Sequence, residues 1–265
     1  MSGYNVNMNY IPPDDRDKRQ IVCIGDSHGC YDELIELLDK IDFNPTTTRL
    51  VFVGDLIDRS SKSLECVKLV RKLCEAGDAE CVRGNHEEKC IRYRNYETKR
   101  YFTGQPNPIR LSKLDAAMHA TYTDADVDWM RRLPLTIHLR DNWFAIHGGL
   151  EPAYKFSQQS PSQITRCRYV NDKGIAVPLK NFEQPLDSVY WTDLWDGPEN
   201  IIYGHMVHSL STPLVDVRPN GTKCIGIDTG VVYGGRLTSY NLDTDTFIQV
   251  QAKKVYYEAK FNIDE

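Results

Sequence analysis

The strongest constraint on the fold is an alternation of short apolar and longer amphipathic segments in the N-terminal third of the chain. The apolar segments have the length of buried strands and lie at residues 21–24, 49–53 and 79–82. Residues 30–41 and 61–77, which lie between them, carry leucine and valine at helical spacing. This β-α-β-α-β order predicts parallel strands with right-handed crossovers, and therefore an α/β domain.

Each predicted strand ends in a glycine-containing loop with polar side chains of metal-ligand type. Two later apolar segments, in NWFAIHGG and NIIYGH, end in the same way. The polar residues at these five strand ends are Asp26, His28, Asp55, Asn85, His147 and His205. Because ligand sites in open α/β sheets form beyond the carboxyl ends of the strands, the loops should meet in space. Carboxylate, imidazole and amide oxygen together suit Mn²⁺, Fe²⁺ or Zn²⁺ rather than a thiolate site.

Taken singly, each of these residues also has an ordinary structural interpretation. A strand-end aspartate commonly caps a turn, and a lone histidine is commonly a residue of the core or the surface whose ring nitrogens are hydrogen-bonded. The histidine pattern argues against this interpretation for the set as a whole. Four of the seven histidines directly follow short apolar strands in glycine-containing loops, namely His28, His86, His147 and His205. We expect the other three, His119, His138 and His208, to be structural.

The later segments predict further elements around this core. Residues 97–134 begin with a turn-rich stretch and continue with two helices, around 111–120 and 124–133, which we interpret as a helical cap or insert. Residues 151–188 look irregular and polar. Residues 206–252 contain short strands without intervening helices, which predicts a mainly antiparallel β layer on the other side of the core.

The polar N-terminus and the overall charge argue against a secreted protein, a transmembrane protein and a general binder of nucleic acid or membranes. Residues 1–19 lack the apolar core of a signal peptide, and we interpret them as a flexible extension before a single domain at residues 20–265. No apolar run reaches the ~18 residues that indicate a transmembrane helix. A net charge of −5 gives no general attraction to nucleic acid or to anionic membranes. Eight cysteines without a C-x-x-C pair are typical of reduced thiols, so we expect a cytoplasmic protein.

Five motifs, in this order, carry a resemblance to a known family: GDSHG, GDLIDR, RGNHE, HGGL and YGH. Over residues 21 to about 240 the chain resembles the calcineurin-like metallophosphoesterases. More narrowly, it resembles the phosphoprotein phosphatase superfamily and its bacterial and phage branch. The resemblance implies a β-sandwich flanked by helices, in α-β-β-α layers. Two positions, Ser27 and Ser60, depart from the family pattern without removing a ligand.

The resemblance implies two divalent metal ions, Mn²⁺ above all, with Fe, Zn, Ni or Co as alternatives. Asp26 and His28 match ligands of the first ion, and Asp55 matches the aspartate that bridges both. The residues that match ligands of the second ion are Asn85, His147 and His205. A metal-activated hydroxide would then attack the phosphoryl group in line.

The resemblance also implies which residues handle the proton and the phosphate. His86 matches the histidine that protonates the leaving oxygen, and Asp58 matches the carboxylate that orients it. Arg59 matches a phosphate-binding arginine, and its planar fork suits phosphate oxygens. A second such arginine is expected between the HGG and GH motifs, where Arg166 and Arg168 are both candidates.

The substrate class is less constrained than the reaction. Residues 189–205 resemble symmetrical diadenosine tetraphosphatases, whereas residues 227–240 resemble both these enzymes and the lambda phage protein phosphatase. We expect nucleotide phosphoanhydrides such as diadenosine tetraphosphate. The alternatives are a protein serine/threonine or broad-specificity phosphomonoester phosphatase, a polyphosphatase, or an inactive scaffold. The aromatic residues that could stack a base, or belong to the core, are Trp129, Trp191, Trp195 and Tyr233.

Overall fold

Two six-stranded sheets form the centre of this computed structural model, which describes residues 10–11, 17–179 and 183–258. The first sheet has the order β13-β14-β2-β3-β4, with β15 paired to β14. Its strands are β2 (Gln20–Ile24), β3 (Thr48–Phe52), β4 (Ala79–Cys81), β13 (Asp228–Thr229), β14 (Arg236–Asn241) and β15 (Thr246–Gln251). Strands β2, β3 and β4 pair in parallel, as the alternation in the sequence predicts.

The second sheet has the order β1-β5-β6-β10-β12-β11. Its strands are β1 (Tyr10–Ile11), β5 (Thr136–His138), β6 (Trp143–Ile146), β10 (Asn200–Tyr203), β11 (Leu214–Val217) and β12 (Lys223–Gly226). The sheets face each other, because alternate residues such as Cys23 and Val51 pack against Ala145 and Ile202 in one buried cluster. The predicted β-sandwich is therefore confirmed.

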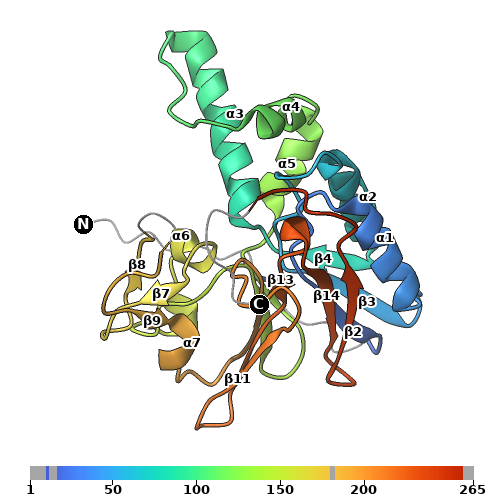
Figure 1. Cartoon of the computed structure of the whole chain (residues 1–265), viewed down its shortest axis with the longest axis vertical. Coiled ribbons are helices and arrows are strands. Elements are labelled where there is room, and N and C mark those ends of the chain that lie inside the picture. Colours follow the sequence, from blue (N-terminus) through green and yellow to red (C-terminus); the bar gives the residue numbers. More distant parts are fainter. Residues whose placement is uncertain (1–9, 12–16, 180–182, 259–265) are drawn as a thin grey trace.

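Helices cover the outer face of the first sheet. Alternate residues of its strands, such as Ile24 and Phe52, point away from the second sheet and pack against Leu34 and Val67. Leu34 lies on α1 (Tyr31–Lys40), and Val67 lies on α2 (Ser63–Ala76). Figure 1 shows α1 and α2 lying along this side of the molecule. The helices anticipated from the leucine and valine spacing thus bury their apolar faces against the parallel strands.

The outer face of the second sheet is covered differently from what the sequence suggests. Residues 151–188, which look irregular, contribute short elements to a layer in which Ile164 and Trp191 pack on Ile201. The layer consists of α6 (Pro161–Ile164), α7 (Trp191–Leu194), β7 (Tyr169–Val170), β8 (Ala176–Val177) and β9 (Val189–Tyr190). Elements this short leave no periodic pattern in a sequence, which is why they are not predicted.

The strands after residue 206 pair mainly antiparallel, as expected, but they do not form one separate layer on the other side of the core. Strands β11 and β12 join the second sheet, where β12 pairs in parallel with β10. Strands β13, β14 and β15 join the first sheet, where β14 pairs antiparallel with β2. An alternating apolar pattern specifies which face of a strand is buried but not which strand lies beside it.

Three helices project from the body of the molecule (Figure 1). They are α3 (Asn85–Thr103), α4 (Lys113–His119) and α5 (Asp124–Arg132). Helices α4 and α5 lie within their predicted ranges, and Thr123 caps α5 by accepting a hydrogen bond from the N–H of Asp126. The turn-rich start expected at residue 97 is wrong, because α3 continues until Gly104, whose φ of 71° ends it.

The expected flexible extension at residues 1–19 falls largely outside the described residues. Its described part includes β1, whose backbone pairs in parallel with β5. All eight cysteines are free thiols. Within the described part of the chain, no helix combines the length and the apolar character that crossing a bilayer requires.

Candidate metal centre

The predicted site residues follow the carboxyl ends of strands from both sheets. Asp26, Asp55 and Asn85 come after β2, β3 and β4 of the first sheet. His147 and His205 come after β6 and β10 of the second sheet. The main chain links the two groups, since the N–H of His205 donates to Asp26 Oδ2 at 3.0 Å. The face-to-face packing of the sheets therefore brings five loops together at one edge of the sandwich.

Five predicted site residues have a left-handed backbone, which is unfavourable for residues other than glycine. Their φ angles are 43° for His28, 50° for Asp55, 68° for Asp58, 69° for Arg59 and 66° for His205. Such conformations cost about 1–3 kcal/mol each and persist only where the surroundings enforce them. The strain is concentrated in the loops that hold the polar side chains.

Two overlapping clusters of metal-ligand side chains share Asp55. Among the described residues, the groups whose ligand atoms all lie within 4.8 Å of one another are His28–Asp55–His86 and Asp55–His147–His205. Asp55 Oδ2 lies 3.6 Å from His28 Nε2, whereas Oδ1 lies 3.3 Å from His147 Nε2. The two oxygens of one carboxylate thus face different clusters. This is the arrangement that a bridging ligand needs.

Two of the histidines, His28 and His147, are held in the tautomer that leaves Nε2 free to bind a metal ion. Nδ1–H of His28 donates to the carbonyl of Ile57 at 2.7 Å, and Nδ1–H of His147 donates to that of Val53 at 2.8 Å. A carbonyl oxygen only accepts, so each Nε2 presents its lone pair to the clusters. Asn85 Oδ1 lies 3.0 Å from the same Nε2 of His147. The amide oxygen therefore belongs to the second cluster.

Asp26 fits a cation as well, although it is in neither cluster. Its Oδ1 is buried and, among the described residues, has no hydrogen-bond partner. Burial, Asp228 and Asp55 raise the pKa of Asp26 well above its usual range. Gly204 leaves room for this carboxylate, since a Cβ there would lie 2.0 Å from Oδ1. Crowded carboxylates with an unused oxygen fit a divalent ion, so the residues present suit the metals that the resemblance implies.

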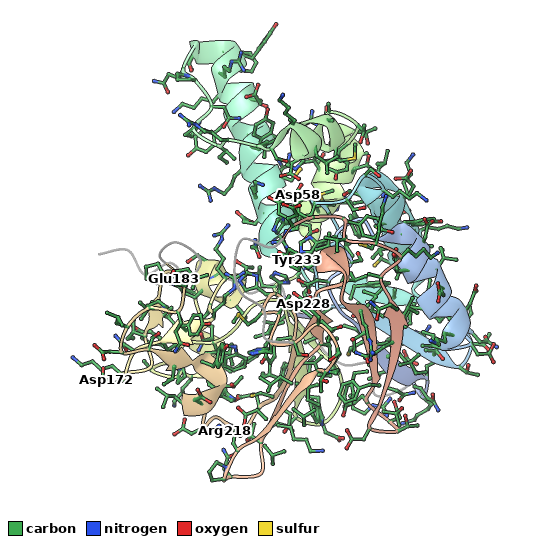
Figure 2. All side chains as sticks on the ribbon, in the orientation of Figure 1. Asp58, Asp172, Glu183, Arg218, Asp228 and Tyr233 are labelled. Atoms are coloured by element: carbon green, nitrogen blue, oxygen red, sulfur yellow. The ribbon has the colours of Figure 1, made fainter. Side chains whose placement is uncertain are left out.

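His86 and Asp58 form a buried pair beside the first cluster. Nδ1–H of His86 donates to Asp58 Oδ2 at 2.7 Å. Burial alone would raise the pKa of Asp58, but hydrogen bonds from His119 and His86 hold it well below its usual range. Figure 2 shows Asp58 at the foot of the projecting helices. Asp58 is therefore ionised and orients His86.

The arginines differ in how they approach the site. Arg59 Nη1 lies 2.7 Å from His28 Nε2, and its guanidinium lies 5.2 Å from the centre of the Tyr233 ring. Arg168 Nη2 lies 3.4 Å from the carbonyl oxygen of His205, whereas Arg166 contacts His205 through its own carbonyl oxygen. Burial and then Arg59 lower the pKa of Arg168. Of the two candidates for the second arginine, Arg168 thus brings its guanidinium to the clusters.

The aromatic residues considered for base stacking are buried. Trp129, Trp191 and Trp195 are between 2% and 6% exposed and belong to the core. Tyr233 is 8% exposed and packs beneath Arg59. These four side chains therefore offer little surface to a nucleobase.

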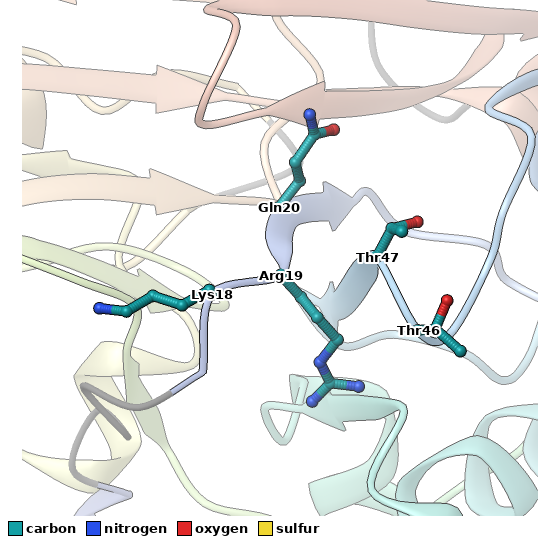
Figure 3. Close-up of a pocket in the computed structure, with 5 residues that line it drawn as sticks. All are labelled: Lys18, Arg19, Gln20, Thr46 and Thr47. Carbon is teal, nitrogen blue, oxygen red and sulfur yellow. The ribbon is translucent and has the colours of Figure 1, made fainter.

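A shallow polar hollow lies elsewhere, at the amino end of β2. Its lining residues are Lys18, Arg19, Gln20, Thr46 and Thr47 (Figure 3). The Arg19 guanidinium is already engaged by Asp17 at 2.8 Å and by the carbonyl of Gly77 at 3.1 Å. The hollow is at the opposite strand end from the clusters, so it is not part of the same site.

Glu87 is a site-forming residue that the sequence reasoning missed. Its Oε2 accepts hydrogen bonds from the N–H groups of Gly84 at 2.9 Å and Asp55 at 3.0 Å. Its Oε1 accepts from the N–H of Leu56 at 2.9 Å. Burial and Asp55 raise the pKa of Glu87 to about 7. A glutamate at the third position of a helix is a capping signal, and RGNHE contains it.

The match to known families covers most of the chain. The model for the family described as calcineurin-like phosphoesterase matches residues 19–225. A symmetrical bis(5'-nucleosyl)-tetraphosphatase from Haemophilus influenzae (strain PittEE) is 29% identical, over 88% of this chain and 97% of the relative. An asymmetrical bis(5'-nucleosyl)-tetraphosphatase from Oceanobacillus iheyensis is 28% identical, over 91% and 96%. The resemblance carried by the five motifs is thus confirmed.

Solved structures show the same fold. The crystal structure of a provisionally assigned diadenosine tetraphosphatase matches with a TM-score of 0.73 and 23% identity, over 92% of this chain and 96% of that one. A serine/threonine phosphatase from Saccharomyces cerevisiae with similarity to human phosphatase PP5 matches with a TM-score of 0.53 and 16% identity, over 95% and 83%. At these identities the likeness concerns the fold alone.

The hydrogen bonds of Glu87 lead to a prediction about stability. At about pH 8.5, where the Glu87 carboxylate is mostly ionised, Glu87→Gln should lower the free energy of unfolding by about 2 kcal/mol. A charged acceptor becomes neutral, and an NH2 group that faces other N–H donors replaces one of its oxygens. Urea denaturation measures the change. The control is Glu88→Gln, which removes a partly exposed ion pair with Arg83 and should cost less than about 0.5 kcal/mol. Equal losses in the two variants would contradict the assignment.

Proposed function

Because the chain belongs to the calcineurin-like phosphoesterase family, we propose that it is a phosphatase with a centre of two divalent metal ions. The family is one of metal-dependent hydrolases, so the chain is a hydrolase of phosphoric esters or anhydrides. The observation that carries the dinuclear proposal is Asp55, whose Oδ1 and Oδ2 face different groups of histidines.

The proposed first ion is held by Asp26, His28 and Asp55. The proposed second ion is held by Asp55 again, with Asn85, His147 and His205. Mn²⁺ is the ion we expect, with Fe, Zn, Ni or Co as alternatives, because oxygen and imidazole donors suit all of them. Such a pair of ions, when bound, acts as a Lewis acid on the phosphoryl oxygens and lowers the pKa of water.

The chain's own residues handle the proton and the substrate. Asp58 accepts the Nδ1–H of His86, so a proton for the leaving oxygen has to come from Nε2–H of the imidazolium form, which leaves the ring neutral with its proton on Nδ1. Nε2 lies 3.9 Å from Asp55 Oδ2, at the edge of the first cluster. We assign the binding of phosphate oxygens to the guanidinium groups of Arg59 and Arg168, which reach His28 and His205 from two loops.

The proposed substrates are nucleotide phosphoanhydrides such as diadenosine tetraphosphate. Support comes from the relatives, since both the symmetrical and the asymmetrical enzymes carry tetraphosphatase names and align over most of this chain. The phosphate-binding guanidinium groups of Arg59 and Arg168 would suit a chain of several phosphates. A phosphoprotein or a simple phosphomonoester is the competing substrate class, and kinetics can distinguish them.

A substrate panel tests this proposal. Purified protein supplemented with Mn²⁺ should hydrolyse diadenosine tetraphosphate with a kcat/KM about tenfold or more above that for a phosphopeptide, an aryl phosphate or polyphosphate, a gap of about 1.4 kcal/mol. A tenfold preference for the phosphopeptide would overturn the substrate class. Lack of turnover with every substrate and every metal would favour a scaffold.

Asp55→Asn tests the bridging assignment. We expect loss of most bound metal and a fall in kcat/KM of about 100-fold or more, because one carboxylate serves both clusters. Elemental analysis gives the metal content. A matched control is Asp42→Asn, since exposed Asp42 has the same φ of 50° and lies on no cluster. Survival of both metal content and turnover in Asp55→Asn would make the assignment wrong.

His86→Asn distinguishes a general acid from a ligand. His86 lies in the first cluster by distance, so both roles are geometrically open. We expect unchanged metal content and a kcat lowered by about 10²–10⁴-fold, which is the usual contribution of a general acid. Loss of one metal ion in this variant would instead make His86 a ligand.

A further inference from the structure

Helix α4 presents two buried polar side chains to the loop that follows β3. Asp115 and His119 are four residues apart and therefore lie on one face of the helix. They are 7% and 5% exposed, although the helix belongs to the projecting part of the molecule. Burial of two such groups on a short helix calls for specific polar partners.

Both side chains bind the same turn, residues 58–59. Nε2–H of His119 donates to Asp58 Oδ1 at 2.7 Å. Asp115 Oδ1 accepts from the main-chain N–H of Arg59 at 3.2 Å. Lys89 Nζ, from α3, lies 3.3 Å from Asp58 Oδ2 and 3.5 Å from Asp115 Oδ2. The helical insert is thus tied to the turn by side chain and by main chain.

The turn needs such support because of its backbone. Asp58 and Arg59 are consecutive residues with φ of 68° and 69°. Neither is glycine, so the turn is strained and depends on its surroundings. Each oxygen of the Asp58 carboxylate accepts one imidazole N–H, Oδ2 from His86 and Oδ1 from His119, both at 2.7 Å. Without His119, the carboxylate could rotate away from His86.

We propose that His119 is a positioning residue for the reaction, which fixes the Asp58 carboxylate so that His86 stays aimed at the leaving oxygen. This inference rests on the proposed role of His86 as general acid. The inference gives the helical insert a role in the reaction, because His119 would act on His86 through Asp58.

The proposal makes a claim about leaving groups that a merely structural role does not. A proton from His86 matters for phenyl phosphate, whose leaving oxygen is strongly basic, and little for dinitrophenyl phosphate, whose leaving group is stable as an anion. His119→Phe keeps an aromatic ring beside Tyr93 and Tyr122 but removes the donor. It should lower kcat for phenyl phosphate about tenfold or more and kcat for dinitrophenyl phosphate less than about threefold, with KM unchanged for both.

Two further variants test the same role of His119 even if His119→Phe does not fold. In His119→Gln the side-chain amide reaches as far as Nε2 of histidine and should restore most of the phenyl phosphate activity. In His119→Asn the shorter amide should not, and this contrast decides the question if the phenylalanine variant does not fold. The control is His138→Phe, which changes another histidine that stacks on Phe144 and should leave the two kcat values in their original ratio.

The outcomes separate this proposal from the one on which it rests. Equal losses on both phosphates in His119→Phe, or equal activity of the glutamine and asparagine variants, would overturn the positioning role. If His86→Asn showed the leaving-group dependence and His119→Phe did not, only the role of His119 would fail. If His86→Asn itself showed none, the general-acid assignment would fail first.

Discussion

Three hydrogen bonds to one buried carboxylate hold the site together. Glu87 accepts the N–H groups of Gly84, Asp55 and Leu56, so the loop after β3 and the start of α3 become one unit. Asp55 in turn accepts the N–H of His86 through Oδ1 at 2.9 Å. The loops after β3 and β4 therefore cannot shift independently, because the carboxylates of Glu87 and Asp55 bind the main chain on both sides of Asn85 and around Asp55.

The unfavourable backbone of the site is tolerated because neighbouring elements enforce it from several directions. The loop after β2 is bonded to the loop after β3, since the N–H of His28 donates to the carbonyl of Asp55 at 2.9 Å. The second sheet is bonded to the first through His147 and Val53. If these residues bind an ion or a phosphate as proposed, a set held in this way would lose little conformational freedom on binding, which is what preorganisation means physically.

The sequence predicts what is local and periodic, and it misses what is long-range. Strand ends with Asp26, Asp55 and His147 are visible because apolar runs and glycines mark them. The contact between His119 and Asp58 joins residues 61 positions apart, so the local sequence pattern around His119 does not predict it. The same limit explains why β12 beside β10 is unexpected, whereas the sandwich and its helices are predicted. Glu87 could have been found, because a glutamate near a helix start is a capping signal.

The division of the proposed ligands between the two sheets has a consequence for the folded state itself. Asp26, Asp55 and Asn85 follow strands of the first sheet, and His147 and His205 follow strands of the second. An ion bound between them would act as a cross-link across the sandwich, in parallel with the apolar contacts that already join the sheets. Ligands that bind only the native state add their binding free energy to its stability. The concentration of free metal ion would then govern the stability of the folded protein as well as its rate of turnover.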